Sequence, residues 1–409
     1  MAVALPFAVP SADTPIRATP LPFHRVSLTE EECAAVLRVL RSGWLTTGQE
    51  SAAFEAELAA YLDVPHAATL NSCTAGLHLG LLVAGIGPGD VVITTPFTFC
   101  ASVNVIEHVG ALPLLVDVDP RDGCLSLEAL EALPVAKGRQ RCVLPVHYAG
   151  NPVDMPRLVE WAGQRDAVIL SDAAHALETR IQGRSMASWS DLSAYSFYAT
   201  KNVTTGEGGC LTAIRPDWNE RIRTLRLHGM SADALRRYEP GAPPTYDVTE
   251  PGFKYNLPDP AAALGRLQLA AVETHWIRRA ELVARYRALF APLLDSGAIR
   301  LLIPDPATQT TSNRSAYHLC PLVINPNAWK IDRNAVIARL NAEGISTSIH
   351  FTPVHQFSYY AKRYGFTPDA FPVAASLGAN EISLPLHPWL TDDEVEQVCA
   401  AILKVWATL

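Results

Sequence analysis

The sequence predicts an α/β fold in which helices cover both faces of a mostly parallel sheet. From residue 66 to residue 172, short apolar runs alternate with helical segments of about ten residues. After Pro258 the alternation stops, and one long helical stretch precedes a few shorter helices and strands. This change predicts a large sheet domain followed by a smaller α+β domain.

The 409 residues are enough for two to three domains of about 150 residues each. We expect three parts: a flexible Pro-rich arm over residues 1–24, a large domain over 25–275 and a small C-terminal domain over 276–409. Charged residues make up 18% of the chain, below the usual ~25%. A surface partly covered by a partner subunit is consistent with this low fraction.

The first expected helix begins at Thr29, a capping residue that three glutamates follow. Further helices of the large domain follow from apolar residues at helical spacing, and they are expected at 51–62, 71–85, 101–109, 125–133 and 155–162. Strands are expected at 66–70, 90–94, 111–118, 142–146 and 167–170. The small domain should contain strands at 317–323 and 345–351 and helices at 333–343, 392–405 and 260–294, the last continuous or broken near His275.

Composition excludes several classes of function. The net charge of −8 argues against binding of nucleic acid, which requires a basic face. No apolar run reaches the ~18 residues of a membrane span, and the apolar N-terminus has no basic region, so we interpret it as a flexible leader rather than a signal peptide. The eight cysteines form no C-x-x-C pair and no zinc-like cluster, which predicts buried free thiols in a reducing cytoplasm and no metal site.

A possible anion site lies in Asn71–Gly76 (NSCTAG), at a junction between a loop and a helix. Small residues there let backbone N–H groups approach a ligand, and the helix N-terminus favours a negative charge. Alone, the segment fits an ordinary helix cap better.

Asp172 and His175 follow the buried strand at 167–170. A carboxylate at the end of a buried strand needs a cationic or hydrogen-bonding partner. Asp172 could equally be a helix cap, and His175 could be a core histidine.

Lys201 ends a run of aromatic and small residues, SAYSFYATKN, and a glycine-rich stretch follows it. A lysine in a desolvated pocket favours the neutral amine, which can form an imine with an aldehyde. The alternative is a lysine that simply extends to solvent. Taken together, the anion site, the carboxylate and the lysine fit pyridoxal phosphate, which has a phosphate, a ring nitrogen and an aldehyde.

Ten ordered segments carry a family resemblance that runs from about Arg41 to Trp406. They are SGWLTTG (42–48), SCTAGLHLGL (72–81), PVHYAG (145–150), SDAAHALE (171–178), YSFYATKN (195–202), GEGG (206–209), RLHG (226–229), PGFKYNLPDPAAALGRLQL (251–269), HFTPVH (350–355) and SLPLHP (383–388). The chain resembles the DegT-type nucleotide-sugar aminotransferases, which have fold type I of the pyridoxal-phosphate enzymes. PVHYAG, DAAHA and PGFKYNL resemble most the branch of UDP-4-amino-4-deoxy-L-arabinose aminotransferases. The resemblance implies a seven-stranded, mostly parallel sheet in the cofactor domain.

The resemblance also implies roles for individual residues. Lys201 matches the lysine that forms the Schiff base and moves protons, and Asp172 matches the carboxylate on the pyridine nitrogen. The other implied cofactor contacts are Cys73, Thr74 and Ser196 at the phosphate, Phe99 and His175 at the ring, and Asn256, which the neighbouring subunit of a homodimer provides to the phosphate. Many relatives have Gly or Ala where this chain has Cys73.

The implied reaction moves an amino group from an amino acid, usually glutamate, to a keto-sugar nucleotide, at C4 of a UDP-linked sugar by branch resemblance. Candidate substrate contacts are Lys254, Arg226 and His350, although each suits a purely structural role equally well. Such enzymes serve the biosynthesis of cell-surface polysaccharides, among other pathways.

Three alternatives remain. A sugar dehydratase of the same fold replaces the lysine by histidine, and a non-catalytic sensor would lose Lys201 or Asp172, so both are disfavoured here. A lyase or decarboxylase acting on amino acids would lack the HYAG, KYN and HF segments.

Overall fold

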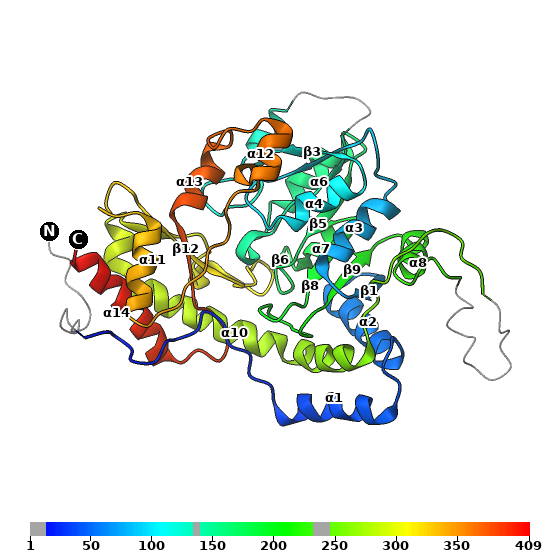
Figure 1. Cartoon of the computed structure of the whole chain (residues 1–409), viewed down its shortest axis with the longest axis horizontal. Helices are drawn as coiled ribbons and strands as arrows, with labels where there is room; N and C mark the ends of the chain where they lie inside the picture. The colour runs from blue at the N-terminus through cyan, green and yellow to red at the C-terminus, as the bar shows by residue number, and fades with distance from the viewer. Residues whose placement is uncertain (1–13, 134–139, 232–245) are drawn as a thin grey trace.

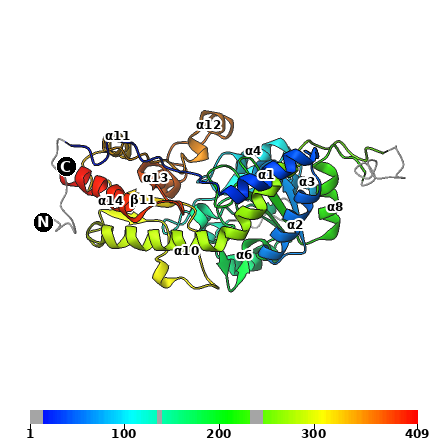
Figure 2. The same ribbon diagram turned by 90° about the horizontal axis from the view of Figure 1, so that it is seen from below.

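The structure is a computed structural model that describes residues 14–133, 140–231 and 246–409. Figure 1 shows a large sheet domain and a smaller lobe connected by one long helix, α10 (Asp259–Asp295). Figure 2 shows from below that α10 runs from the large domain into the lobe, where the C-terminal helix α14 (Asp392–Ala407) packs along it.

The large sheet has seven strands, nearly all parallel. Their order is β1 (His66–Leu70), β9 (Gly209–Ala213), β8 (Leu192–Ser196), β5 (Val168–Asp172), β4 (Gln140–Val143), β2 (Val91–Thr94) and β3 (Leu112–Leu115). Only β9 runs antiparallel to its neighbours. The predicted α/β class and the seven-stranded, mostly parallel sheet are confirmed.

Helices cover both faces of this sheet because side chains alternate along each strand. On one face, Leu170 belongs to the apolar cluster of α3 (Cys73–Val83), α4 (Ala101–His108) and α8 (Pro216–Leu225). On the other face, Ile169 belongs to a second cluster, which includes residues of α2 (Gln49–Leu62), α6 (Met155–Gly163) and α7 (Met186–Trp189). Other described elements of this domain are α1 (Glu30–Ser42), α5 (Leu127–Glu131), a short 3-10 helix (Tyr148–Gly150), β6 (Arg180–Ile181) and β7 (Arg184–Ser185).

The smaller lobe contains an antiparallel sheet of β10 (Ile299–Leu301), β11 (Cys320–Ile324) and β12 (Glu381–Leu384). Its shorter helices are α11 (Arg333–Ala342), α12 (Ser358–Tyr364) and α13 (Pro372–Asn380). The α+β character predicted for this part of the chain is therefore present.

Several elements differ from the sequence predictions. β8, β9 and α8 were not predicted. Every residue of β9 and all but the last residue of β8 are buried, so neither strand has the alternation of buried and exposed positions that marks a half-buried strand. The strand predicted at 345–351 is wrong: only single bridges form there, Leu21 with Ile345 and Ser348 with Ser383. The segment turns instead so that residues 349–351 line a cavity.

The boundary predicted at residue 275 falls inside α10, which continues without a break at His275. One helix therefore belongs to both parts of the molecule, and the division at 275 stays a prediction.

Part of the predicted arm packs against the small lobe. The backbone N–H of Leu21 donates to Gly344 O at 2.8 Å, and the Leu21 side chain is buried. Residues 14–24 thus lie along the lobe instead of standing free, while residues 1–13 of the predicted arm lie outside the described residues.

All eight cysteines are free thiols. Five are buried as predicted, but Cys33 is exposed on α1, and Cys73 and Cys100 are only half-buried. Among the described residues, none of the helices combines the length and the apolar character needed to cross a bilayer.

Gly209, the first residue of β9, contacts the turn before α3 so closely that a methyl group does not fit. A Cβ atom there would lie 2.4 Å from the carbonyl carbon of Ser72 and 2.5 Å from the nitrogen of Cys73. We expect Gly209→Ala to destabilise the protein by about 1–3 kcal/mol through overpacking, measured as a lower thermal midpoint.

Gly163→Ala is the matched control, because a Cβ atom at Gly163 meets nothing within 4 Å. This variant should unfold within about 0.5 kcal/mol of the wild type. Equal thermal midpoints for the two variants would show that the contact at Gly209 is not tight.

Candidate active site

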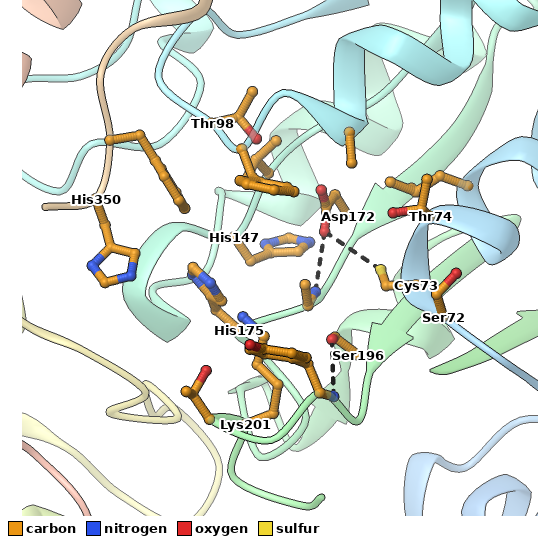
Figure 3. A pocket seen from close by; sticks show the side chains of 18 of the residues that line it. Ser72, Cys73, Thr74, Thr98, His147, Asp172, His175, Ser196, Lys201 and His350 are labelled. Atoms are coloured by element: carbon orange, nitrogen blue, oxygen red, sulfur yellow. Dashed lines mark hydrogen bonds between the residues drawn. The ribbon is translucent and has the colours of Figure 1, made fainter. Parts of the chain in front are cut away.

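A cavity of about 490 Å³ opens at the carboxyl edge of the large sheet. Open α/β sheets bind ligands at this edge. Six segments line the cavity: the turn that begins α3, residues 98–101 at the start of α4, residues 146–147 after β4, the end of β5, the loop after β8, and residues 349–351. Figure 3 shows side chains from all six segments gathered around one space.

The turn before α3 presents backbone N–H groups to the cavity. Ser72 caps the helix by accepting from the N–H of Ala75 at 3.1 Å, and Cys73 and Thr74 line the cavity. N–H groups in the first turn of a helix have no carbonyl partner within the helix, so this end of α3 suits an anion such as a phosphate.

Asp172 ends β5 and is buried, with donors at both carboxylate oxygens. Ser102 Oγ donates to Oδ2 at 2.7 Å, and the backbone N–H of Ala174 donates to Oδ1 at 3.1 Å. Burial raises the pKa of Asp172, and these two hydrogen bonds oppose the rise. A protonated ring nitrogen beside the carboxylate would lower the pKa of Asp172 further.

Lys201 is half-buried in the loop after β8 and lines the same cavity. Burial lowers the pKa of its amine to about 8, although the negative charge of Asp172 favours the charged form. About a tenth of such amines are neutral at pH 7, so Lys201 is a usable nucleophile. Its Nζ atom lies 3.4 Å from Nε2 of His318.

Two further predicted ring contacts lie in the cavity lining. The backbone N–H of Ala149 donates to Nδ1 of His175 at 3.3 Å, and burial lowers the pKa of His175 well below its usual value. The ring is therefore neutral, with its proton on Nε2. Phe99 is 60% exposed, and its ring centroid lies 6.3 Å from that of Phe351.

Ser196, the last residue of β8, also lines the cavity. Its Oγ atom accepts from the backbone N–H of Tyr198 at 3.3 Å. The hydroxyl proton of Ser196 remains able to point toward an anion at the helix end.

The candidate substrate residues separate into two groups. His350 lines the cavity, and burial lowers its pKa to about 4. Arg226 is buried, pairs with Glu55 and donates to Thr69 O at 2.9 Å, so it is a structural residue and not an available cation. Lys254 is exposed and does not line the cavity.

Asn256 also lies outside the cavity lining of its own chain. Its Nδ2 atom donates to Thr47 Oγ1 at 2.7 Å.

Sequence reasoning missed several residues in and around this site, among them Ser102, Phe351 and His318. Ser102 is three positions after Phe99 in the sequence, and Phe351 directly follows His350. Closeness in sequence to a predicted site residue is the one feature that could have indicated either of them. His318 belongs to a segment predicted as a strand, and nothing in the sequence connects it with Lys201.

The chain therefore has fold type I of the pyridoxal-phosphate enzymes: a seven-stranded sheet with a lysine and a carboxylate at the carboxyl edge of its parallel strands. The sequence matches the DegT/DnrJ/EryC1/StrS aminotransferase family over residues 26–403. The chain belongs to this family.

Similar proteins come from several bacteria. The chain is 39% identical to the spore coat polysaccharide biosynthesis protein SpsC of Bacillus subtilis, with 94% of this chain and 97% of that protein covered. It is 37% identical to the UDP-4-amino-4-deoxy-L-arabinose–oxoglutarate aminotransferase of Shewanella sediminis, with 94% and 98% covered. A solved structure of a putative sugar aminotransferase from Streptococcus pneumoniae, in its PMP form, has a TM-score of 0.85 at 33% identity, with 95% and 99% covered.

The lowered pKa of Lys201 predicts how its reactivity changes with pH. A neutral amine is the reactive form, so labelling of Lys201 in the protein freed of cofactor should increase with pH around a midpoint near 8. The measurement is a brief pulse of an acylating reagent followed by mass spectrometry of the Lys201 peptide. The peptide of the exposed Lys362 reports the reagent dose. A midpoint near 10.5 would show that burial does not affect this amine.

Proposed function

We infer that the chain transfers an amino group from an amino acid to a keto-sugar linked to a nucleotide, with pyridoxal phosphate as its cofactor. The observation that carries this inference is the cavity itself, in which Lys201, Asp172 and the open N-terminus of α3 face one space. Family membership identifies the reaction as amino transfer. The similar structures of the Streptococcus pneumoniae protein in PLP and PMP forms support the cofactor.

When bound, pyridoxal phosphate supplies an aldehyde carbon that accepts the amino group and a ring that accepts electrons. We propose that Lys201 would hold the cofactor through that carbon. When it is not bonded to the cofactor, the amine of Lys201 would act as general base and general acid for the proton that moves during transfer. A pKa near 8 suits both roles, because neither protonation state is rare near neutral pH.

The other cavity residues hold the cofactor in this proposal. Asp172 keeps the ring nitrogen protonated, because a buried carboxylate strongly favours an adjacent cation. The first turn of α3, at Cys73 and Thr74, binds the phosphate together with Ser196. His175 and Phe99 contact the ring from their positions in the lining.

Glutamate is the donor that we propose, and C4 of a UDP-linked sugar is the position that we propose for amination. The 37% identical UDP-4-amino-4-deoxy-L-arabinose–oxoglutarate aminotransferase of Shewanella sediminis supports this choice of sugar nucleotide. His350 is the remaining candidate contact to the sugar nucleotide within the cavity, whereas Lys254 is exposed and lies outside the cavity lining. Since Arg226 is not available, the diphosphate requires other donors.

We propose a homodimer whose partner subunit provides Asn256 to the phosphate. Asn256 does not line the cavity of its own chain. Two large apolar side chains of the cavity lining are exposed, Phe99 by 60% and Tyr198 by 46%, and Leu45, two residues before the Thr47 that binds Asn256, is exposed by 51%. A partner subunit that covers these side chains would remove them from water. We place the enzyme in the cytoplasm, where its eight free thiols would stay reduced.

A screen of acceptors tests the reaction. With glutamate as donor, the protein should aminate at least one UDP-, dTDP- or GDP-linked 4-keto or 3-keto sugar. Lys201→Ala should reduce the rate at least about a hundredfold, because it removes the nucleophile and general base. It should also abolish the yellow colour and the borohydride-fixed cofactor on the Lys201 peptide.

Lys362→Ala, at an exposed lysine on α12, is the control and should keep full activity. If every sugar nucleotide fails while a free amino acid is turned over, the sugar assignment is wrong.

Mixing two inactive variants tests the shared site. Lys201→Ala and Asn256→Ala subunits should each form inactive dimers, whereas a heterodimer has one site in which both residues are intact. Because random exchange makes half of the dimers mixed, the mixture should recover about a quarter of the wild-type rate. An active Asn256→Ala dimer, or a mixture that stays inactive after exchange, would exclude a shared site.

A further inference from the structure

A chain of buried and half-buried polar groups ends at the amine of Lys201. Lys201 Nζ lies 3.4 Å from His318 Nε2, and His318 Nδ1 lies 3.0 Å from Asn202 Oδ1. Asn202 Nδ2 then donates to both carboxylate oxygens of Glu178 at 3.0 Å. Glu178 pairs with Arg279 of α10, and both side chains are fully buried.

The ion pair between Glu178 and Arg279 determines which group donates in each hydrogen bond of this chain. A carboxylate paired with a guanidinium only accepts, so the amide NH₂ of Asn202 faces Glu178. A second acceptor for the same NH₂ group, the carbonyl oxygen of Ala316 at 3.2 Å, supports this orientation. The amide oxygen of Asn202 therefore faces His318, and Nδ1 of His318 must carry the proton.

A neutral His318 with its proton on Nδ1 has a lone pair on Nε2. Burial lowers the pKa of His318 well below its usual value, which keeps the ring neutral. Nε2 can then only accept, and Lys201 must donate.

The ring of His318 is held firmly in place. Its backbone N–H donates to Ala149 O at 3.0 Å, and its ring centroid lies 4.3 Å from that of His175. Tyr317, immediately before it, has a φ of 48°, a left-handed conformation that is rare for an aromatic residue.

We propose that His318 is the positioning residue of Lys201: its Nε2 atom accepts from the amine whenever the amine is not bonded to the cofactor. Because the amine uses an N–H group for this bond, its lone pair stays free to face the aldehyde carbon or a substrate proton. This proposal rests on the proposed role of Lys201.

The other titratable groups that face Lys201 come from several elements. Asp172 at the end of β5 and Cys73 on α3 interact with it electrostatically, as do His175, His350 and His24. Burial lowers the pKa of each of these three histidines and raises the pKa of the Cys73 thiol well above its usual value, so these four groups are neutral and Asp172 is the one of the five that can carry a charge. Loss of the His318 acceptor should favour the neutral form of Lys201, because an acceptor stabilises the ammonium more strongly than the amine.

The test follows covalent attachment of added pyridoxal phosphate to the protein freed of cofactor, by visible absorbance and by borohydride trapping on the Lys201 peptide. We expect His318→Phe to slow attachment at saturating cofactor at least tenfold and to move the pH midpoint of attachment downward. His318→Gln can place an amide oxygen near the position of Nε2, and it should remain within about threefold of the wild-type rate with an unchanged midpoint. Thermal midpoints of both variants report folding.

Asn202→Ala provides a second route that leaves the His318 ring in place. It frees the tautomer of His318, and attachment should again slow severalfold. Suppose that wild-type protein is labelled on Lys201, and that His318→Phe and Asn202→Ala both attach the cofactor at the wild-type rate and with the wild-type pH midpoint. This result would overturn the positioning role of His318 and leave the proposed function intact. The role is also overturned if His318→Gln, folded like the wild type, is as slow as His318→Phe. Labelling of wild-type protein at another lysine would overturn both proposals.

Discussion

The buried ion pair between Glu178 and Arg279 connects the parts of this molecule that form the site. Glu178 follows β5 in the large domain, and Arg279 lies on α10, beyond the predicted domain boundary. Arg279 also donates to the carbonyl oxygen of Ala316, next to the segment that holds His318. A buried charge without its partner is very unfavourable, so neither group can move away from the other. The lysine loop, which is the loop after β8 that carries Lys201, is bound to the same pair because Asn202 donates hydrogen bonds to Glu178.

The cavity contains several weakly basic groups and yet is not strongly charged. His175, His318 and His350 all have lowered pKa values because they are buried, and therefore they act as neutral donors and acceptors. Asp172 and Lys201 are the two proposed catalytic groups whose protonation state depends on their burial in the cavity. Since the pKa of Asp172 is raised and that of Lys201 is lowered, burial drives both toward their neutral forms, and a cationic, phosphorylated ligand can reverse this at Asp172.

Much of this arrangement could be predicted from the sequence, because local patterns determine it. The strand at 66–70 and the long helix at 260–294, which is α10, follow from the spacing of apolar residues. The candidate site residues Lys201 and Asp172 follow from ordered sequence motifs. Non-local packing accounts for what could not be predicted. β8 and β9 are buried along nearly their whole length and lack the alternation of a half-buried strand, whereas the burial of Arg226 depends on Glu55, which lies 171 positions away along the chain. The contact of His318 with Lys201 likewise spans 117 positions, and no motif contains both residues.

The wall of the cavity formed by residues 349–351 has a different kind of support. His350 contacts Ser383 through its ring at 2.8 Å and donates its backbone N–H to Glu381 at 2.8 Å, and both partners belong to β12 of the small lobe. Nothing in this support uses Asp172, the turn before α3 or the lysine loop. A mutation in β12 can therefore reshape the wall at His350 while leaving Asp172 and Lys201 in place, whereas a change at Phe351 would also affect His175 and Phe99. Such independence would allow descendants of one ancestral enzyme to diverge toward different sugars while retaining the same chemistry.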